Sequence, residues 1–387
     1  MSDRLPVAPP VLRWALDRSG REMTDAEERF RSLTKWLDGK ASPTINQLHE
    51  FAKFTRTPYG LLFLPMPPAD QPQTAEFRRK FNVAELNPSR ELLDTMVERQ
   101  DWLSEFRRQE GQDPVEFVGH LKRPARPTSQ TEIINSAAQL RGVLSLSEDW
   151  SLKLPRVESA FRTLRQNAEA IGVVVMVRSI VGNDSHRPLS VDEFRGFALV
   201  DHHAPLVFIN GRDARVGQLF TLTHELVHIG LGTDDIASSR QTSGHRSIER
   251  FCNQVTAEVL IPESLLRAEA VSEIQTVDAI RELAKRFNVS PAAMVFRASD
   301  LGILDKSVRH AATRLQPSEK RKRSSSGGPD FKVVKRSNIG EPFARAIRQA
   351  VLSERISYRD AYRLTGTRGK TFDETFISQP TRRGVSE

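Results

Sequence analysis

The strongest constraint on the fold is a change of hydrophobic pattern near residue 172. The preceding stretch, from about residue 86 to 170, carries apolar residues at helical spacing. Three short apolar runs then follow, each long enough for one strand: 172–177, 195–200 and 205–210. From Gly211 to about Leu301 the helical pattern returns. Because strands and helices occupy separate blocks, we predict an α+β domain with a small three-stranded sheet.

Composition narrows the class of protein. The 387 residues include 57 Lys and Arg and 49 Asp and Glu, which gives a net charge of +8. At about 100–200 residues per domain, this length predicts two or three domains. A hydrophobic content of 38% excludes wholesale disorder, and a lone cysteine, Cys252, excludes a disulfide scaffold. No apolar run is long enough for a membrane span, and the first ten residues lack a signal core, so we expect a cytoplasmic protein.

The first 70 residues predict a bundle of short helices. Thr24 and Glu27 have the spacing of a capping box, and a helix over Phe30–Asp38 is expected to follow. Pro43-Thr44 is expected to start the next helix. A proline-rich stretch near residues 65–72 reads as a linker.

Most of the remaining chain outside the α+β domain is expected to be helical or flexible. Residues 71–170 are interpreted as a helical linker region. Residues 303–387 are interpreted as a basic, flexible linker, which includes the KRKR run 320–323, and a helical tail. The α+β domain itself is placed at residues 171–302.

The motif that most directly indicates a function is FTLTHELVH, residues 220–228. His224 and His228 are four residues apart, so on a helix both imidazoles lie on one face and can reach the same metal ion. Neutral imidazole is a good zinc ligand, and zinc makes water acidic enough to ionise near pH 7. Glu225 follows His224 directly and has the carboxylate that can accept the water proton. This H-E-x-x-H pattern is the signature of zinc peptidases.

A third protein ligand is expected from a second helix, residues 247–262. Glu249 could complete a His-His-Glu set, and Asn253, one turn later, could hold Glu249 or a histidine. Alternative ligands remain open at this stage, and they are Glu258, Cys252, His245 and the pair His202 and His203. Packing is the simpler role for Cys252.

These two motifs together resemble the ImmA/IrrE-type metallopeptidases. That family pairs an FTLAHELGH-like helix with an E-x-x-x-N-x-x-A-x-x-L-L-x-P helix, for which this chain has FTLTHELVH and, over 249–262, ERFCNQVTAEVLIP. The resemblance implies that His224, His228 and Glu249 bind Zn²⁺ and that Glu225 is the catalytic base. It favours Glu249 over Glu258, and it implies a gluzincin-like endopeptidase that cleaves a transcriptional repressor or another partner regulator.

The N-terminal residues resemble the XRE-type helix-turn-helix domains that are often fused to these peptidases, and residues 75–78 resemble a short DFR-like element of the family. The candidate DNA contacts are Arg31, Thr34, Lys35 and Lys40. These four residues offer few groups that could recognise bases. The alternative interpretation is that this domain contacts a protein. The alternative to a peptidase is therefore a DNA-binding regulator, or an antitoxin, with a structural or sensory metal site. If the chain is a peptidase, we expect its substrate to lie along an edge strand within 195–210.

Overall fold

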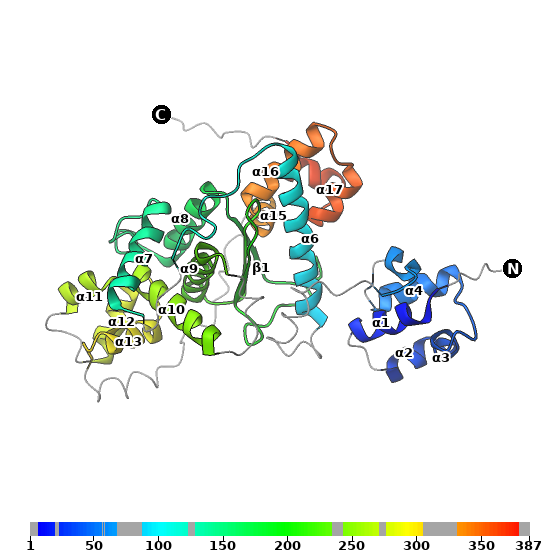
Figure 1. The fold of residues 1–387 in the computed structure, drawn as a ribbon, viewed down its shortest axis with the longest axis horizontal. Coiled ribbons are helices and arrows are strands. Elements are labelled where there is room, and N and C mark those ends of the chain that lie inside the picture. The colour runs from blue at the N-terminus through cyan, green and yellow to red at the C-terminus, as the bar shows by residue number, and fades with distance from the viewer. Residues whose placement is uncertain are drawn as a thin grey trace. The chain divides into compact units, whose positions relative to one another are not determined.

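The computed structural model describes residues 7–19, 23–55, 57, 59–67, 87–122, 128–233, 243–270, 276–304 and 331–378. Several sequence expectations concern residues outside these ranges: the linker beyond residue 67, the DFR-like element at 75–78 and the KRKR run at 320–323. The chain forms two compact units, Met1–Leu93 and Asp94–Glu387, and the boundary falls within one helix, α6 (Asn87–Gln109) (Figure 1).

The first unit is a small helical bundle. Its elements are α1 (Pro9–Ser19), α2 (Met23–Arg29), α3 (Leu33–Leu37), α4 (Ile45–Thr55) and the 3₁₀ helix η1 (Tyr59–Phe63). An aromatic cluster fills the core, in which Phe30 contacts Trp36 and Phe51 with ring centroids 5.9 and 5.6 Å apart. Arg13 of α1 donates a hydrogen bond of 2.8 Å to the carbonyl of Leu37, which ties α1 to the end of α3.

The helix boundaries of this unit differ from the sequence expectation in two places and agree in a third. Thr24 lies inside α2 and not before it, so it is not the predicted N-cap. A turn over Phe30–Ser32 also splits the expected helix, which leaves only α3 in its second half. Thr44 does precede α4, where its hydroxyl accepts from the Gln47 amide and the Gln47 side chain accepts from the Thr44 amide, at 3.3 and 2.9 Å.

The second unit contains the sheet and most of the helices. The helices before the sheet are α6, α7 (Gln130–Val143) and α8 (Val157–Ala170). The strands are β1 (Val174–Arg178), β2 (Gly196–Leu199) and β3 (Leu206–Asn210). The helices after the sheet are α9 (Arg215–Leu231), α10 (Ser243–Leu260), α11 (Glu263–Ala270), α12 (Val277–Arg286) and α13 (Pro291–Asp300). Beyond residue 330 follow α15 (Phe331–Ile339), α16 (Glu341–Leu352), α17 (Tyr358–Thr365), α18 (Gly369–Phe372) and the π-helical turn η2 (Asp373–Ile377).

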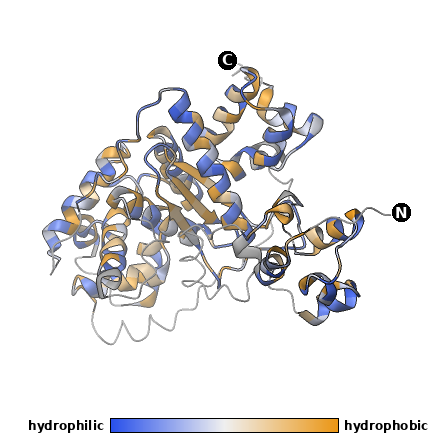
Figure 2. Cartoon of the chain, turned by 45° about the vertical axis from the view of Figure 1, so that its right-hand side comes forward, coloured by the Kyte–Doolittle hydropathy of each residue, from blue (hydrophilic) through white to orange (hydrophobic). Residues whose placement is uncertain are grey.

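The predicted three-stranded sheet is confirmed, and it is mixed. The strand order is β1-β3-β2, with β3 parallel to β1 and antiparallel to β2. β3 is therefore central and buried along its whole length, which explains its unbroken apolar sequence. Figure 2 shows the strands as a hydrophobic centre among helices that carry polar residues on their outer sides.

Both faces of the sheet are covered by helices. Val175 of β1 and Val207 and Ile209 of β3 belong to the same hydrophobic core as Leu219, Leu222 and Leu226 of α9. On the opposite face, Gln100 of α6 donates hydrogen bonds of 2.8 and 3.0 Å to the carbonyls of Leu199 and Ala204. α15 and α16 pack on β1 on this side of the molecule (Figure 1).

Among the described residues, helices from the expected linker region and from the expected tail pack on the α+β domain. α7 and α8 pack against α10 and α9 and contribute to the core of the sheet domain. Within the expected linker and tail, residues 303–387, a helix begins at Phe331, where α15 starts and lies against β1. These amphipathic helices need an apolar surface to cover, and the sheet supplies it.

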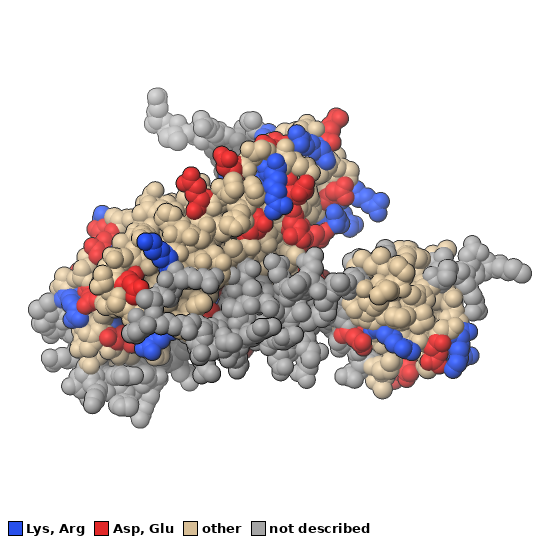
Figure 3. Space-filling view, in the orientation of Figure 1, with Lys and Arg blue, Asp and Glu red and all other residues tan. Residues whose placement is uncertain are grey.

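None of the described helices is both long enough and apolar enough to cross a membrane. On the face shown in Figure 3, basic and acidic side chains are mixed over both units, and neither sign dominates.

Candidate metal centre

α9 holds the two histidines in a fixed position. It ends at Gly232, which has φ +63°, and the amides of Gly232 and Thr233 bond to the carbonyls of Ile229 and His228 at 2.9 and 3.1 Å. A Cβ atom at Gly230 would lie 2.7 Å from Leu121, so this glycine allows the segment 115–121 to pack directly on α9. The amide of Leu121 bonds to the Gly230 carbonyl at 2.7 Å. The end of the helix is therefore anchored on both sides.

Glu249 of α10 faces both histidines. The Nε2 atoms of His224 and His228 are 3.1 Å apart, and they lie 3.5 and 3.3 Å from the carboxylate oxygens of Glu249. Within the described residues, these three form the one group of His, Cys, Asp and Glu whose ligand atoms converge closely enough for a metal ion.

The donor set fits zinc. Two ligands on a tetrahedral zinc ion with bonds of about 2.0–2.1 Å are separated by roughly 3.3 Å. The three observed separations fall on either side of this value. The His228 side chain is fully buried, whereas His224 and Glu249 are 13% and 28% exposed. An ion held here would therefore have one side open to solvent and substrate.

The electrostatics of the centre favour an ionised carboxylate. Burial acts to raise the pKa of Glu249, but hydrogen bonds and charge attraction from His224 and His228 outweigh it, so the pKa lies well below the ordinary value. Glu225, between the two histidines in sequence, is buried at 3% exposure. Phe220, one turn before His224 in α9, stacks on the His224 ring, with centroids 6.3 Å apart.

Glu258 lies elsewhere and has a different environment. It forms a buried ion pair with Arg297 of α13 and accepts weak hydrogen bonds of 3.3 and 3.4 Å from the Glu263 amide. Arg297 also donates to the Ile261 carbonyl at 3.1 Å. Glu258 therefore joins α10 to α11 and α13, and it is not part of the converging group.

The remaining alternative ligands also lie outside the group. Cys252 is fully buried in the core, on the α10 side of the sheet. His202 and His203 follow β2, where their carbonyls accept from the Val115 amide and from Arg107 at 2.7 and 2.5 Å. The side chain of His245 is outside the described part of the structure.

The part of the chain that contains the candidate metal centre is similar to known proteins. Residues 168–299 match the family model described as the IrrE N-terminal-like domain, Peptidase_M78. The radiation response metalloprotease IrrE of Deinococcus radiodurans is 31% identical over 136 residues. Residues 168–299 are therefore similar to the IrrE N-terminal-like domain.

The matched region is limited in extent. The alignment with the Deinococcus radiodurans protein covers 33% of this chain and 41% of that protein. A second family model, a domain of unknown function (DUF8813), matches residues 339–376. The IrrE-like domain thus contains β1–β3, α9, α10 and the converging histidines and glutamate, whereas α16 and α17 fall in the second match.

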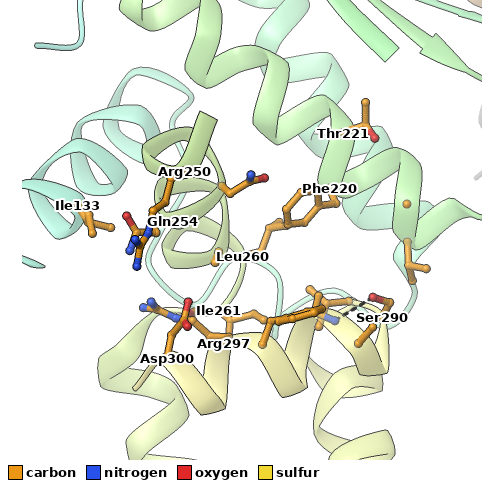
Figure 4. Close-up of a pocket in the computed structure, with 18 of the residues that line it drawn as sticks. Ile133, Phe220, Thr221, Arg250, Gln254, Leu260, Ile261, Ser290, Arg297 and Asp300 are labelled. Atoms are coloured by element: carbon orange, nitrogen blue, oxygen red, sulfur yellow. Dashed lines mark hydrogen bonds between the residues drawn. The ribbon is translucent and has the colours of Figure 1, made fainter. Parts of the chain in front are cut away.

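A cleft in the IrrE-like domain begins at Glu249 and has a volume of about 890 Å³. Side chains from α7, α9, α10 and α13 line it, and Figure 4 shows Phe220, Leu260 and Arg297 around a common space. Asn253 lines this cleft and is exposed, with no hydrogen bond to Glu249 or the histidines among the described contacts. The predicted supporting role of Asn253 is therefore not seen.

Sequence reasoning missed one residue beside the centre. The hydroxyl of Thr233 lies 3.5 Å from Nδ1 of His228, the ring nitrogen that points away from Glu249. Metal-bound histidines commonly use this second nitrogen for a hydrogen bond that fixes the ring. The sequence signal for Thr233 is its position directly after Gly232, because the turn at the end of α9 brings the Thr233 side chain back over the last helical residues.

The four residues predicted to contact DNA are all exposed in the first unit. Two of them have acidic partners: the Thr34 hydroxyl donates to Glu27 at 3.1 Å, and Lys40 pairs with Asp38 at 2.8 Å. Hydrogen bonding and attraction from Asp38 raise the pKa of Lys40. Arg31 and Lys35 remain on the same exposed surface.

Proposed function

We propose that the chain is a zinc-dependent endopeptidase whose metal ligands are His224, His228 and Glu249. The convergence of these three side chains at zinc-ligand spacing carries the proposal. The similarity of residues 168–299 to the IrrE N-terminal-like domain supports it. A bound zinc ion would supply Lewis acidity, which lowers the pKa of water and polarises a carbonyl group.

Glu225 is proposed as the general base and acid. Its carboxylate takes the proton of the attacking water and hands it to the leaving amine, the two proton transfers that peptide hydrolysis requires. The proposal is supported by the buried position of Glu225 in the helix that carries both histidines. Phe220 and side chains of α10 line the cleft that begins at Glu249.

The substrate is proposed to be an extended protein segment, in keeping with a peptidase of narrow specificity. Of the expected edge strands, β3 is central, which leaves β2 as the edge next to α9. A Cβ atom at Gly196 would lie 2.5 Å from Thr221, so β2 and the metal-bearing helix are in close contact. Pairing of a peptide with β2 would carry it past the cleft mouth, since Arg195 and Thr221 both line the cleft.

A helix-turn-helix repressor, or another regulator encoded beside this chain, is the proposed substrate, and the first unit is proposed to recognise it. The acidic partners of Thr34 and Lys40 support contact with protein more than contact with phosphates. A DNA-binding regulator or an antitoxin with a structural metal site is the competing function, and it predicts no cleavage of any regulator.

The test is to incubate the zinc-loaded protein with the regulator encoded next to it and to follow cleavage by mass spectrometry. Glu225→Gln keeps the size and burial of the side chain but removes the base. We expect it to retain zinc and to lose activity by about 10²–10⁴-fold. Glu116→Gln, at an exposed position, is the matched control and retains activity. Undiminished cleavage by the Glu225→Gln protein would contradict the mechanism.

A further inference from the structure

Two arginines are buried beneath the sheet face opposite to the metal centre. Arg178, the last residue of β1, is 6% exposed, and Arg99 of α6 is 2% exposed. Arg99 donates to the Leu364 carbonyl at 2.8 Å and contacts the sulfur of Met176 at 3.6 Å. Met176 and Arg178 lie on the same side of β1, because side chains alternate along a strand. The two guanidinium groups therefore belong to one buried layer.

Neither of these charges has a carboxylate in direct contact among the described residues, although Glu98 attracts Arg99 at longer range. Neither Arg99 nor Arg178 forms an ion pair with any residue that the structure describes, and Nε of Arg178 is buried without an acceptor. Burial and repulsion from Arg178 lower the pKa of Arg99 to about 9. Buried charges and buried donors are costly unless they are paired, so this arrangement is one that a bound anion would stabilise.

The buried arginines bond to two chain segments that border an open pocket of about 1100 Å³, although neither arginine lines the pocket. Arg178 donates to the Gly182 carbonyl and Arg99 to the Leu364 carbonyl, and the Asn183 side chain joins these two segments by donating to the Gly366 carbonyl. Asn183 and Gly366 both line the pocket. Lys335 of α15 donates to the Asn183 side chain at 3.1 Å.

The pocket lining adds further positive charge. Arg359, Arg363 and Arg368 line it, and among these only Arg363 has acidic partners within the described residues, Glu98 and Asp360. Asp360 also lines the pocket, but it pairs with Arg363, so Arg359 and Arg368 have no carboxylate partner among the described residues. The planar fork of arginine matches phosphate oxygens, and several converging arginines favour a multiply charged anion.

We propose that this pocket binds a small soluble molecule through a dianionic phosphate group, which Arg359 and Arg368 of the lining hold directly. Arg178 and Arg99 do not line the pocket, and they add positive charge behind the segments to which they bond. The pocket volume is large enough for a ligand that carries more than the phosphate alone. Most of its lining comes from residues 359–368, so the site gives the matched domain of unknown function, residues 339–376, a binding role. It is independent of the peptidase assignment.

The experiment titrates the full-length protein with inorganic phosphate at constant ionic strength and follows binding by calorimetry, with chloride as the comparison anion. Saturable binding of phosphate, with a raised melting temperature that chloride does not produce, is expected. Arg178→Met should weaken it, because the variant removes one of the buried positive charges behind the pocket. Because that variant changes a buried site, Arg368→Gln and Arg359→Gln at the exposed mouth provide a second test, and each should weaken binding about tenfold.

Lys285→Gln, at an exposed position on α12, is the matched control and should bind phosphate like the unmodified protein. Zinc content should be equal in all variants, since the pocket lies across the sheet from the metal centre. Equal phosphate affinity in the Arg368→Gln, Arg359→Gln and Lys285→Gln proteins would overturn the proposal. Retention by phosphatidic acid vesicles or by a DNA duplex, without saturable binding of inorganic phosphate, would overturn it as well.

Discussion

Two glutamates on α10, Glu249 and Glu258, differ in what the rest of the second unit places around them. Glu249 lies near the beginning of the helix, is partly exposed and faces His224 and His228 of α9. Glu258 lies near its end, is buried and pairs with Arg297 of α13. The same residue type on the same helix can thus serve a metal centre or hold helices together, and the partners from other helices decide which.

The largest expected effect is a loss of stability on substitution of Glu258, which tests the structural role given to this glutamate. In the Glu258→Gln protein the buried Arg297 charge loses its counter-ion while the shape of the side chain is preserved. Loss of one partner from a buried pair costs about 3–5 kcal/mol in the free energy of unfolding. Urea denaturation of the zinc-loaded protein measures this change, and a loss below about 1 kcal/mol would show that the pair is not the structural contact described above.

A double substitution distinguishes the stability lost with the ion pair itself from the cost of leaving one charge buried without a partner. Replacing both residues, Glu258→Met with Arg297→Met, removes the two charges together and fills a similar volume. Most of the lost stability should return, because apolar replacements of buried ion pairs are often neutral or stabilising.

A smaller effect, on zinc affinity, is expected at the metal centre from substitution of Thr233. In the Thr233→Val protein the His228 ring loses the hydroxyl next to its Nδ1 atom, and zinc affinity should fall about tenfold. Thr233→Ser keeps the hydroxyl and should bind zinc normally. Competition with a chelator of known affinity measures both. Equal affinities for the valine and serine variants would remove Thr233 from the support of the centre.

The smallest effect is expected from Asn253, one turn after Glu249. Because Asn253 is exposed and makes no hydrogen bond to the ligands, Asn253→Ala should change zinc affinity less than about twofold, well under the effect of a supporting residue. The same chelator competition decides this. A tenfold loss would restore the supporting role that the sequence motif predicts for this residue.

Local patterns predicted the parts of the molecule that depend on local interactions. The apolar runs of β1 and β3 are buried strands as expected, and the spacing of His224 and His228 is a property of any helix. The positions of Glu249 and Glu258 relative to the histidines depend on how α10 crosses α9. That crossing is a tertiary contact, so the sequence left both glutamates open as ligands.

Non-local packing explains where the sequence reading failed. α15 has lysines and arginine among its apolar residues and reads as a charged linker, yet Arg336 bonds to Glu341 and to the Thr375 carbonyl while the helix covers β1. Arg99 and Arg178 lie in an α-helix and a strand that are distant in sequence, and their burial as a pair depends on the docking of α6, α15 and α17 around β1. Periodicity identifies an apolar face, but it does not identify the surface that covers that face.

The most direct test of the central claim is the zinc content of two matched variants after dialysis against zinc-free buffer. Glu249→Gln and Glu258→Gln make the same chemical change on the same helix. We expect the Glu258→Gln protein to retain a stoichiometric zinc ion, as the unmodified protein does, and the Glu249→Gln protein to lose it. Retention of zinc by the Glu249→Gln protein, with its loss from the Glu258→Gln protein, would contradict the account.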